Sequence, residues 1–382
     1  MNVHAHKRDL ADSSAPAKLG IIDCDIHPSV KSKADLKPFM SERWWKHYDT
    51  YGSLVRQGLS TYLPYPRMQP ATARRDSWPP NGGPPASDLD FMRKQHLDAN
   101  NITHGILHPL RIGGYDQRNL DFGAALCTAI NDWQLHAWAE PEPRLKASIY
   151  VPQDFPEAAA AEIERRASDP HFVQITTASF AAQPLGHRRY WPVFEAAQAA
   201  DIAIGMHIGG YSGQAITAGG WPSFYYEHHY ANAPSMESVV TSLVMEGVFE
   251  RFTKLRIALV ESGFVWVPSL CWRLDRLWER MRDEVPHLKR PPSEYIRQNI
   301  WYTTQPIEEP ANPEHLRETI DWIGWDRLMF STDYPHWDYD DPTYAFKFQM
   351  TAQQREALFY GNAAQVYRLP GYRCVVADPA GC

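Results

Sequence analysis

The sequence Ile-Ile-Asp-Cys-Asp-Ile-His-Pro occupies residues 21–28 and is expected to form the first strand of the fold. Side chains alternate between the two faces of a β-strand, so Asp23, Asp25 and His27 are expected to point the same way. A strand that buries carboxylates and an imidazole on one face needs a compensating charge, because an unpaired buried charge is costly. Carboxylate oxygens and imidazole nitrogens are ordinary ligands of divalent cations. The stretch therefore predicts a strand that ends at a metal site.

Seven further strand candidates follow, and helical segments separate them. The strands are expected at 103–108, 145–152, 172–176, 202–208, 256–261, 299–304 and 328–333, and the helices at 87–99 (with Ser87 as N-cap), 122–140, 155–167, 189–200, 235–249, 266–281 and 313–323. Strands joined by helical crossovers form a parallel sheet. Eight such units predict an α/β fold of the closed (β/α)8 TIM barrel type. The alternative, an open doubly wound sheet, usually has a Gly-rich turn after its first strand, whereas this chain has His27-Pro28.

The barrel is expected to form one domain over residues 19–369, between an N-terminal tail (1–18) and a C-terminal tail (370–382). A long insertion rich in Trp, Tyr, Pro and Gly occupies residues 31–86, directly after the first strand, and is expected to be irregular. Loops of this length are usually functional or flexible. The 382 residues are 44% hydrophobic and 22% charged, which is enough apolar material for a large core.

The composition also limits the classes of molecule that the protein is expected to bind. The net charge is -7 and no basic stripe is visible, which argues against nucleic acid. Neither a secretory signal nor an apolar run of membrane-spanning length is present, so no membrane partner is expected. The five cysteines are scattered outside CxxC pairs, which favours neither a disulfide framework nor a thiolate zinc site. We therefore expect a cytoplasmic protein with a small-molecule substrate, and the 14 Trp residues suggest a pocket lining or a homodimer interface.

Polar residues gather where the predicted strands end. In a TIM barrel, catalytic groups sit at the C-terminal ends of the strands. The ends of the first, second, fifth, sixth and eighth strands carry, in order, Asp25 with His27, His108, His207, Glu261 and Asp333. These side chains are expected to converge on one mouth of the barrel.

Four segments resemble a known family. They are IDCDIH at 22–27, GMHIGG at 205–210, FSTDYPH at 330–336 and GNAA at 361–364. They are similar to the amidohydrolase superfamily, in the branch that contains aminocarboxymuconate-semialdehyde decarboxylase and the resorcylate decarboxylases, over roughly residues 19–369. The resemblance implies one divalent metal ion held by Asp25, His27, His207 and Asp333, with Asp333 also accepting the proton of the metal-bound water.

Two positions depart from the family pattern. The family often has His at the place of Asp25, and a carboxylate makes the ligand set harder; zinc is expected first, with manganese or iron as alternatives. Many relatives have His at the place of Glu261, which is either a proton shuttle or further ligand, or a salt-bridge or helix-cap residue. The fourth strand has no Lys, which favours a single metal over a pair bridged by a lysine carbamate.

Further residues are candidates for binding the substrate. His108 and Arg111 follow the second strand and either contact an anionic group or are structural. His228 and His229 lie in the loop after His207, and either reach the pocket or dock the loop on the barrel rim. His336, three residues beyond Asp333, is expected to orient neighbouring groups.

The predicted function is a metal-dependent hydrolase of a small organic substrate, with Asp333, Glu261 and His207 as catalytic residues. A bound metal lowers the pKa of water from near 16 to roughly 7, and a nearby carboxylate can take the proton. The alternative is a metal-dependent non-oxidative decarboxylase of an aromatic or unsaturated acid, because the same ligands serve both reactions. An alternative of another class is a non-catalytic barrel that binds a ligand or partner through the aromatic insertion.

Overall fold

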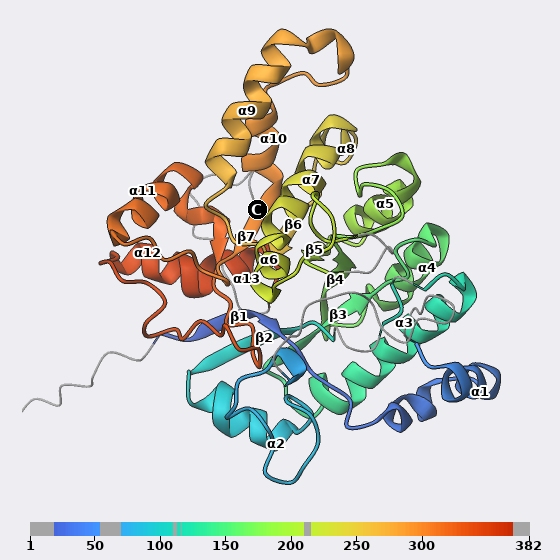
Figure 1. Cartoon of the computed structure of the whole chain (residues 1–382). Coiled ribbons are helices and arrows are strands. Elements are labelled where there is room, and N and C mark those ends of the chain that lie inside the picture. Colours follow the sequence, from blue (N-terminus) through green and yellow to red (C-terminus); the bar gives the residue numbers. More distant parts are fainter. Residues whose placement is uncertain (1–18, 54–69, 110–112, 116, 210–214, 370–382) are drawn as a thin grey trace, which may run out of the picture.

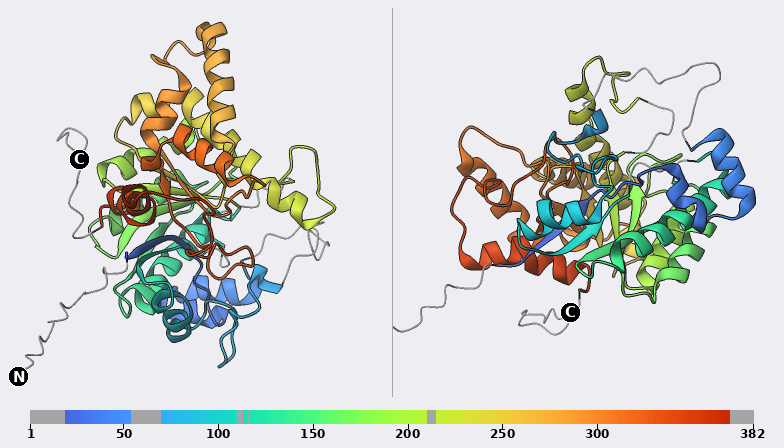
Figure 2. Two further views of the ribbon diagram at one scale, coloured as in Figure 1. Left: turned by 90° about the vertical axis from the view of Figure 1, so that its left-hand side faces the viewer. Right: turned by 90° about the horizontal axis from the view of Figure 1, so that it is seen from below.

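The computed structural model describes residues 19–53, 70–109, 113–115, 117–209 and 215–369. Eight parallel strands form one sheet in the order β1 to β8, and helices surround it (Figures 1 and 2). The strands are β1 (Ile21–Ile26), β2 (Ile102–Leu107), β3 (Leu145–Tyr150), β4 (Phe172–Ala178), β5 (Ala203–His207), β6 (Ile257–Val260), β7 (Ile300–Thr303) and β8 (Leu328–Met329). The predicted (β/α)8 TIM barrel is confirmed.

The helices follow the strands in the predicted alternation. The α-helices are α1 (Glu42–Tyr51), α2 (Leu89–Met92), α3 (Leu120–Gln134), α4 (Pro156–Arg166), α5 (Trp191–Ala199), α6 (Tyr225–Tyr230), α7 (Asn232–Met245), α8 (Val248–Arg251), α9 (Val267–Arg280), α10 (Pro292–Asn299), α11 (Pro313–Ile323), α12 (Ala352–Glu356) and α13 (Asn362–Val366). The other helical segments are η1 (Lys33–Phe39), η2 (Pro70–Thr72), η3 (Arg93–Asp98), η5 (Leu135–Ala139), η6 (Arg188–Tyr190), η7 (Arg282–Glu284), η8 (Trp325–Arg327) and η9 (Ala357–Gly361).

Local signals explain the helix ends, and some predictions about them were wrong. The Asn312 side chain caps α11, and Gly324 ends it with a φ of 112°. The N-cap of α2 is Asp88 rather than Ser87, because the Asp88 carboxylate accepts a hydrogen bond of 2.9 Å from the Phe91 N–H. The insertion was expected to be irregular, but α1 lies within it and is capped by Ser41.

Some predictions fall on residues outside the described ranges. They are the two tails, residues 54–69 of the insertion, Arg111, and Gly210 at the end of the second family segment.

The barrel closes between β8 and β1 through a few separate hydrogen bonds. The Cys24 N–H donates to the Phe330 carbonyl at 3.0 Å, and the His27 N–H donates to the Tyr334 carbonyl at 2.8 Å. The pairing of β1 with β2 shifts register between Asp23 and Ile26. The strict alternation expected for β1 is therefore interrupted before its functional end.

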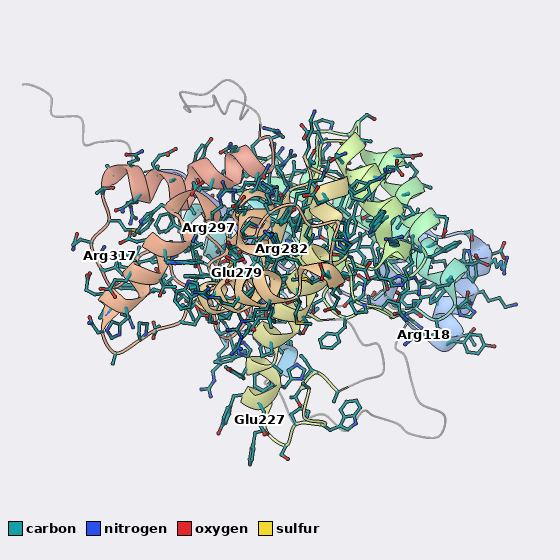
Figure 3. All side chains as sticks on the ribbon, turned by 90° about the horizontal axis from the view of Figure 1, so that it is seen from above. Arg118, Glu227, Glu279, Arg282, Arg297 and Arg317 are labelled. Carbon is teal, nitrogen blue, oxygen red and sulfur yellow. The ribbon has the colours of Figure 1, made fainter. Side chains whose placement is uncertain are left out.

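The core lies between the barrel wall and the surrounding helices, and every residue of β1, β4, β5 and β6 is buried. Such burial on both faces is normal for a parallel sheet covered by helices. Charged side chains such as Arg317, Glu279 and, on α6, Glu227 lie on the outside of the molecule (Figure 3). Within the described ranges, every helix is too short or too polar to span a lipid bilayer.

Candidate metal centre

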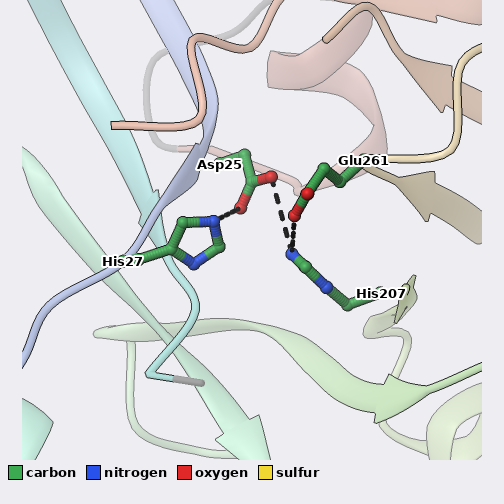
Figure 4. Close-up of side chains that lie close together, drawn as sticks. All are labelled: Asp25, His27, His207 and Glu261. Carbon is green, nitrogen blue, oxygen red and sulfur yellow. Dashed lines mark ion pairs between the residues drawn. The ribbon is translucent and has the colours of Figure 1, made fainter. Parts of the chain in front are cut away.

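Three strand ends bring four buried side chains together. Asp25 and His27 come from the end of β1, His207 closes β5, and Glu261 follows β6 (Figure 4). The His27 Nε2 lies 3.2 Å from Asp25 Oδ1, and the His207 Nε2 lies 3.6 Å from Asp25 Oδ2 and 3.2 Å from Glu261 Oε2. Ligand atoms at this spacing can share one cation.

A second group overlaps with the first through His27 and Glu261 and adds Asp333 and His336 from the segment after β8. Asp333 Oδ1 lies 2.7 Å from His27 Nε2 and 2.6 Å from His336 Nδ1. The rings of His27 and His336 stack with centroids 4.4 Å apart. All the residues predicted as metal ligands therefore lie in one cluster.

Two carboxylate residues of the cluster have a strained backbone. Glu261 has a φ of 57° and Asp333 a φ of 62°, in the left-handed region that non-glycine residues rarely adopt. Conformations of this kind persist only where the surroundings enforce them, and they gather at functional sites. The strain therefore favours a functional role for Glu261 over that of a simple helix cap.

Hydrogen bonds orient both imidazoles toward the centre. His27 Nδ1 lies 2.9 Å from the His108 carbonyl oxygen, and His207 Nδ1 lies 2.6 Å from the Ile208 carbonyl oxygen. A carbonyl only accepts, so each Nδ1 carries the hydrogen and each Nε2 faces the cluster. This arrangement is typical of metal-binding histidines, whose second nitrogen is fixed by a hydrogen bond.

The donor set fits a divalent cation. No described residue donates a hydrogen bond to either carboxylate oxygen of Asp25 or to Asp333 Oδ2, although these atoms are buried. Buried carboxylates without donors need a cation nearby. Two carboxylates and two imidazoles converge here, and oxygen and nitrogen donors of this kind suit zinc, manganese and iron.

The pKa shifts in the cluster also indicate that positive charge stabilises its carboxylates. Burial opposes ionisation of Asp25, but His27 and His207 more than offset it, so the pKa of Asp25 lies well below its usual range. Burial likewise opposes protonation of His207, yet Asp25 and Glu261 raise its pKa to about 10. Each imidazole thus supplies positive charge to the carboxylates, and a cation would do so in its place.

The other two carboxyl groups behave in the opposite way. Burial raises the pKa of Asp333 well above its usual range, and it also raises the pKa of Glu261, with Asp333 contributing. Burial and the neighbouring His27 lower the pKa of His336 to about 3. The centre therefore combines one strongly ionised carboxylate with two that hold protons readily.

Three of the predicted substrate-binding residues in the described part of the chain are His108, His229 and His228. His108 is buried beside the metal centre, with its Nε2 3.0 Å from the Gln174 amide nitrogen. His229 Nε2 lies 2.9 Å from Asp338 Oδ2. The Asp338 carboxylate also accepts a hydrogen bond from Gln305. His228, half-buried, stacks its ring near that of Tyr225 with centroids 6.0 Å apart. Their contact with a substrate stays a prediction.

The structure also shows neighbours that the sequence did not reveal. Tyr225 accepts a hydrogen bond of 3.0 Å from the Trp337 indole, and together with His229–Asp338 this contact fastens α6 to the segment after β8. Gln174, which lies on β4, contacts His108. One sequence signal pointed to these neighbours: Trp337 and Asp338 directly follow the motif at 330–336 along the chain.

Comparisons with known proteins identify the family of this chain. The profile of the family described as Amidohydrolase matches residues 22–369. The gamma-resorcylate decarboxylase of Polaromonas sp. (strain JS666 / ATCC BAA-500) is 27% identical over 258 residues, 63% of this chain and 75% of that protein. The predicted resemblance is confirmed.

Solved structures show the same fold. The 5-carboxyvanillate decarboxylase of Sphingomonas paucimobilis is 21% identical, with a TM-score of 0.66 over 92% of this chain and 100% of that one. The dihydroxybenzoic acid decarboxylase of Polaromonas sp. JS666, solved with bound manganese and the inhibitor 2-nitroresorcinol, is 20% identical, with a TM-score of 0.65 over 92% of this chain and 98% of that one.

Proposed function

We propose that this chain, which belongs to the amidohydrolase family, is a metal-dependent non-oxidative decarboxylase of an aromatic carboxylic acid. The observation that carries the proposal is the buried cluster at the strand ends, in a chain similar to a gamma-resorcylate decarboxylase. The decarboxylase was the alternative in the sequence-based prediction. The similarity supports it better than the hydrolase that was predicted first.

The metal in this proposal is a single Mn²⁺ held by Asp25, His27, His207 and Asp333. Zinc was expected first, but the similar Polaromonas structure contains manganese, and the carboxylate at Asp25 makes this ligand set harder. When bound, the metal supplies positive charge that fixes and polarises the oxygen groups of the substrate. Glu261 is close enough to His207 to join the ligands or to remain a proton carrier.

The residues of the chain move the proton. In this reaction the ring carbon that bears the carboxylate gains a proton, the bond to the carboxylate breaks, its electron pair returns to the ring, and CO₂ leaves. Asp333 is the proposed donor because its buried carboxyl group lies inside the cluster, with Oδ1 2.7 Å from His27 Nε2. Glu261, whose Oε2 lies 3.2 Å from His207 Nε2, is proposed to restore that proton.

The segment from α6 to the loop after β8 is the proposed substrate rim. Asp338 raises the pKa of His229 through their hydrogen bond, which favours a positive charge near the mouth. A positive imidazole there suits the carboxylate of the substrate. The aromatic rings of Tyr225 and Trp337, with centroids 6.1 Å apart, offer faces against which an aromatic ring can pack. The homodimer and the cytoplasmic location stay predictions from the sequence.

One assay separates the two reactions. The Mn²⁺-loaded protein is tested on a panel of hydroxybenzoates for CO₂ release and on a parallel panel of amides and lactones for hydrolysis. CO₂ release with a matching loss of substrate is expected on the first panel alone. Turnover confined to amides or lactones would refute the decarboxylase and restore the hydrolase.

A further inference from the structure

Asp23 and His96 form a buried pair that the proposed reaction does not use. Both side chains are fully buried, and the His96 Nε2 lies 2.8 Å from Asp23 Oδ2. Asp23 lies on β1, two residues before Asp25, and His96 lies on η3. Among the described residues, the side chains that bond to the Asp23 carboxylate are those of His96 and Thr332, and neither is a proposed metal ligand.

The Asp23 carboxylate is saturated with hydrogen bonds from the seam of the barrel. Thr332 donates twice, from its N–H to Asp23 Oδ1 at 2.9 Å and from its hydroxyl to Oδ2 at 2.6 Å. The Asp25 N–H donates to Oδ1 at 3.2 Å. These donors belong to a residue adjacent to Asp333 and to the ligand Asp25 itself. A carboxylate that accepts several backbone and side-chain donors is a strong local anchor.

The Asp23 carboxylate bonds to backbone groups in a gap between two hydrogen bonds that join β1 to β8 and the segment after it. These two backbone hydrogen bonds are Cys24–Phe330 and His27–Tyr334. In the space between them, the Asp23 side chain takes the place of the backbone acceptor for the N–H groups of Asp25 and Thr332. Buried N–H groups need such partners, because an unsatisfied donor in the protein interior is destabilising.

The same network fixes both neighbours of the strained Asp333. On one side, Thr332 is bound to Asp23. On the other, the Tyr334 N–H donates to the Thr332 hydroxyl at 3.2 Å, and the Tyr334 ring stacks on His96 with centroids 4.6 Å apart. The left-handed conformation of Asp333 is therefore held from both ends.

We infer that the Asp23–His96 pair positions the metal ligands on β1 and after β8, so that Asp25, His27 and Asp333 converge. Asp23 and His96 are positioning residues that act through the backbones of Asp25 and Thr332. The inference rests on the proposed function, because it assigns these residues to the proposed metal centre.

The test measures Mn²⁺ affinity of the full-length, metal-depleted protein by electron paramagnetic resonance of free and bound Mn²⁺, beside the thermal midpoint. Asp23→Asn keeps the shape but removes an acceptor, and the Kd for Mn²⁺ is expected to rise ~10-fold or more, as for other groups that orient metal ligands. Thr332→Val removes the hydroxyl that donates to Asp23 and accepts from the Tyr334 N–H, and it is expected to raise the Kd ~3-fold or more. It serves as the second variant if Asp23→Asn fails to fold.

Glu162→Gln is the matched control. Glu162 is a buried carboxylate on α4 that accepts hydrogen bonds from Asn131 and Arg166 and none from the residues of the metal centre. This variant is expected to lower the thermal midpoint and leave the Kd for Mn²⁺ unchanged. If Thr332→Val and any folded Asp23→Asn protein behave in the same way, the inference is overturned and the pair is merely structural. A wild-type protein that binds no Mn²⁺ would overturn the metal centre and this inference together.

Discussion

Substitution of Asp333 by Asn is the most direct perturbation of the proposed chemistry. The side chain is fully buried, and its Oδ1 lies 2.7 Å from His27 Nε2 and 2.6 Å from His336 Nδ1. Asn has nearly the same shape and is among the residues that best tolerate a left-handed φ. The Asp333→Asn protein should therefore fold, while it loses a metal-binding carboxylate oxygen and the proposed proton donor.

The expected result is a loss of turnover. A positioned acid or base contributes ~10²- to 10⁴-fold, so kcat is expected to fall ~10²-fold or more, which corresponds to ~2.7 kcal/mol in the activation free energy. The assay is CO₂ release at saturating substrate, with the Mn²⁺ content of each preparation measured in parallel. The metal content separates a lost proton donor from a lost ion.

Asp275→Asn is the control. Asp275 lies on α9, in the helical pair α9–α10 at the top of Figure 1, and its carboxylate accepts two hydrogen bonds from Ser293. This variant should keep the wild-type kcat. An Asp333→Asn protein that is fully loaded with Mn²⁺ and turns over at the wild-type rate would refute the assignment of Asp333 as the proton donor.

Two further predictions concern pH and substrate binding. Burial raises the pKa of Asp340 from 3.8 to about 7, so ionisation of this carboxyl lowers the free energy of unfolding as the pH rises from about 5 to about 8. The thermal midpoint of Asp340→Asn should rise relative to that of the wild type over that range. Glu142→Gln is the control: Arg144 holds the pKa of the Glu142 carboxyl at about 2, so the difference in thermal midpoint from the wild type should stay constant. A constant difference for Asp340→Asn would contradict the reasoning. His229→Asn should raise KM for an aromatic carboxylate ~10-fold with kcat changed less than about 3-fold, because one charge-assisted contact is worth about 1.5 kcal/mol. The exposed His315→Asn is its control, and a fall in kcat at unchanged KM would show that His229 does not hold the substrate.

The amino-acid sequence predicted the barrel because its eight strands and most of the helices between them have recognisable local patterns. Strands of the right length alternate with helices such as α11, whose bounds match the prediction. A closed parallel barrel then places the C-terminal ends of all its strands at one mouth, so residues as distant in sequence as His27 and Asp333 could be assigned to one cluster from the sequence alone. The segments IDCDIH and FSTDYPH also carried the family resemblance, which the match over residues 22–369 confirms.

Other features depended on contacts between distant segments. Nothing in the residues around α6 shows that Tyr225 binds Trp337, because a loop is placed by its partners rather than by its own periodicity. Hydrolysis and decarboxylation could not be separated either, since both reactions use the same ligands.

The stretch at 21–28 shows the division most clearly. By itself it predicted a strand with carboxylates and an imidazole near its end, and so a metal site. The family resemblance named Asp25 and not Asp23 as a ligand, and the tertiary structure shows which groups Asp23 contacts instead. The register shift in β1 and the gap at the β1–β8 seam direct Asp23 to Thr332 and His96, whereas Asp25 faces His27 and His207. The physical reason is that a strand's own sequence sets its alternation, but its partners across the seam decide which buried donors each carboxylate must satisfy.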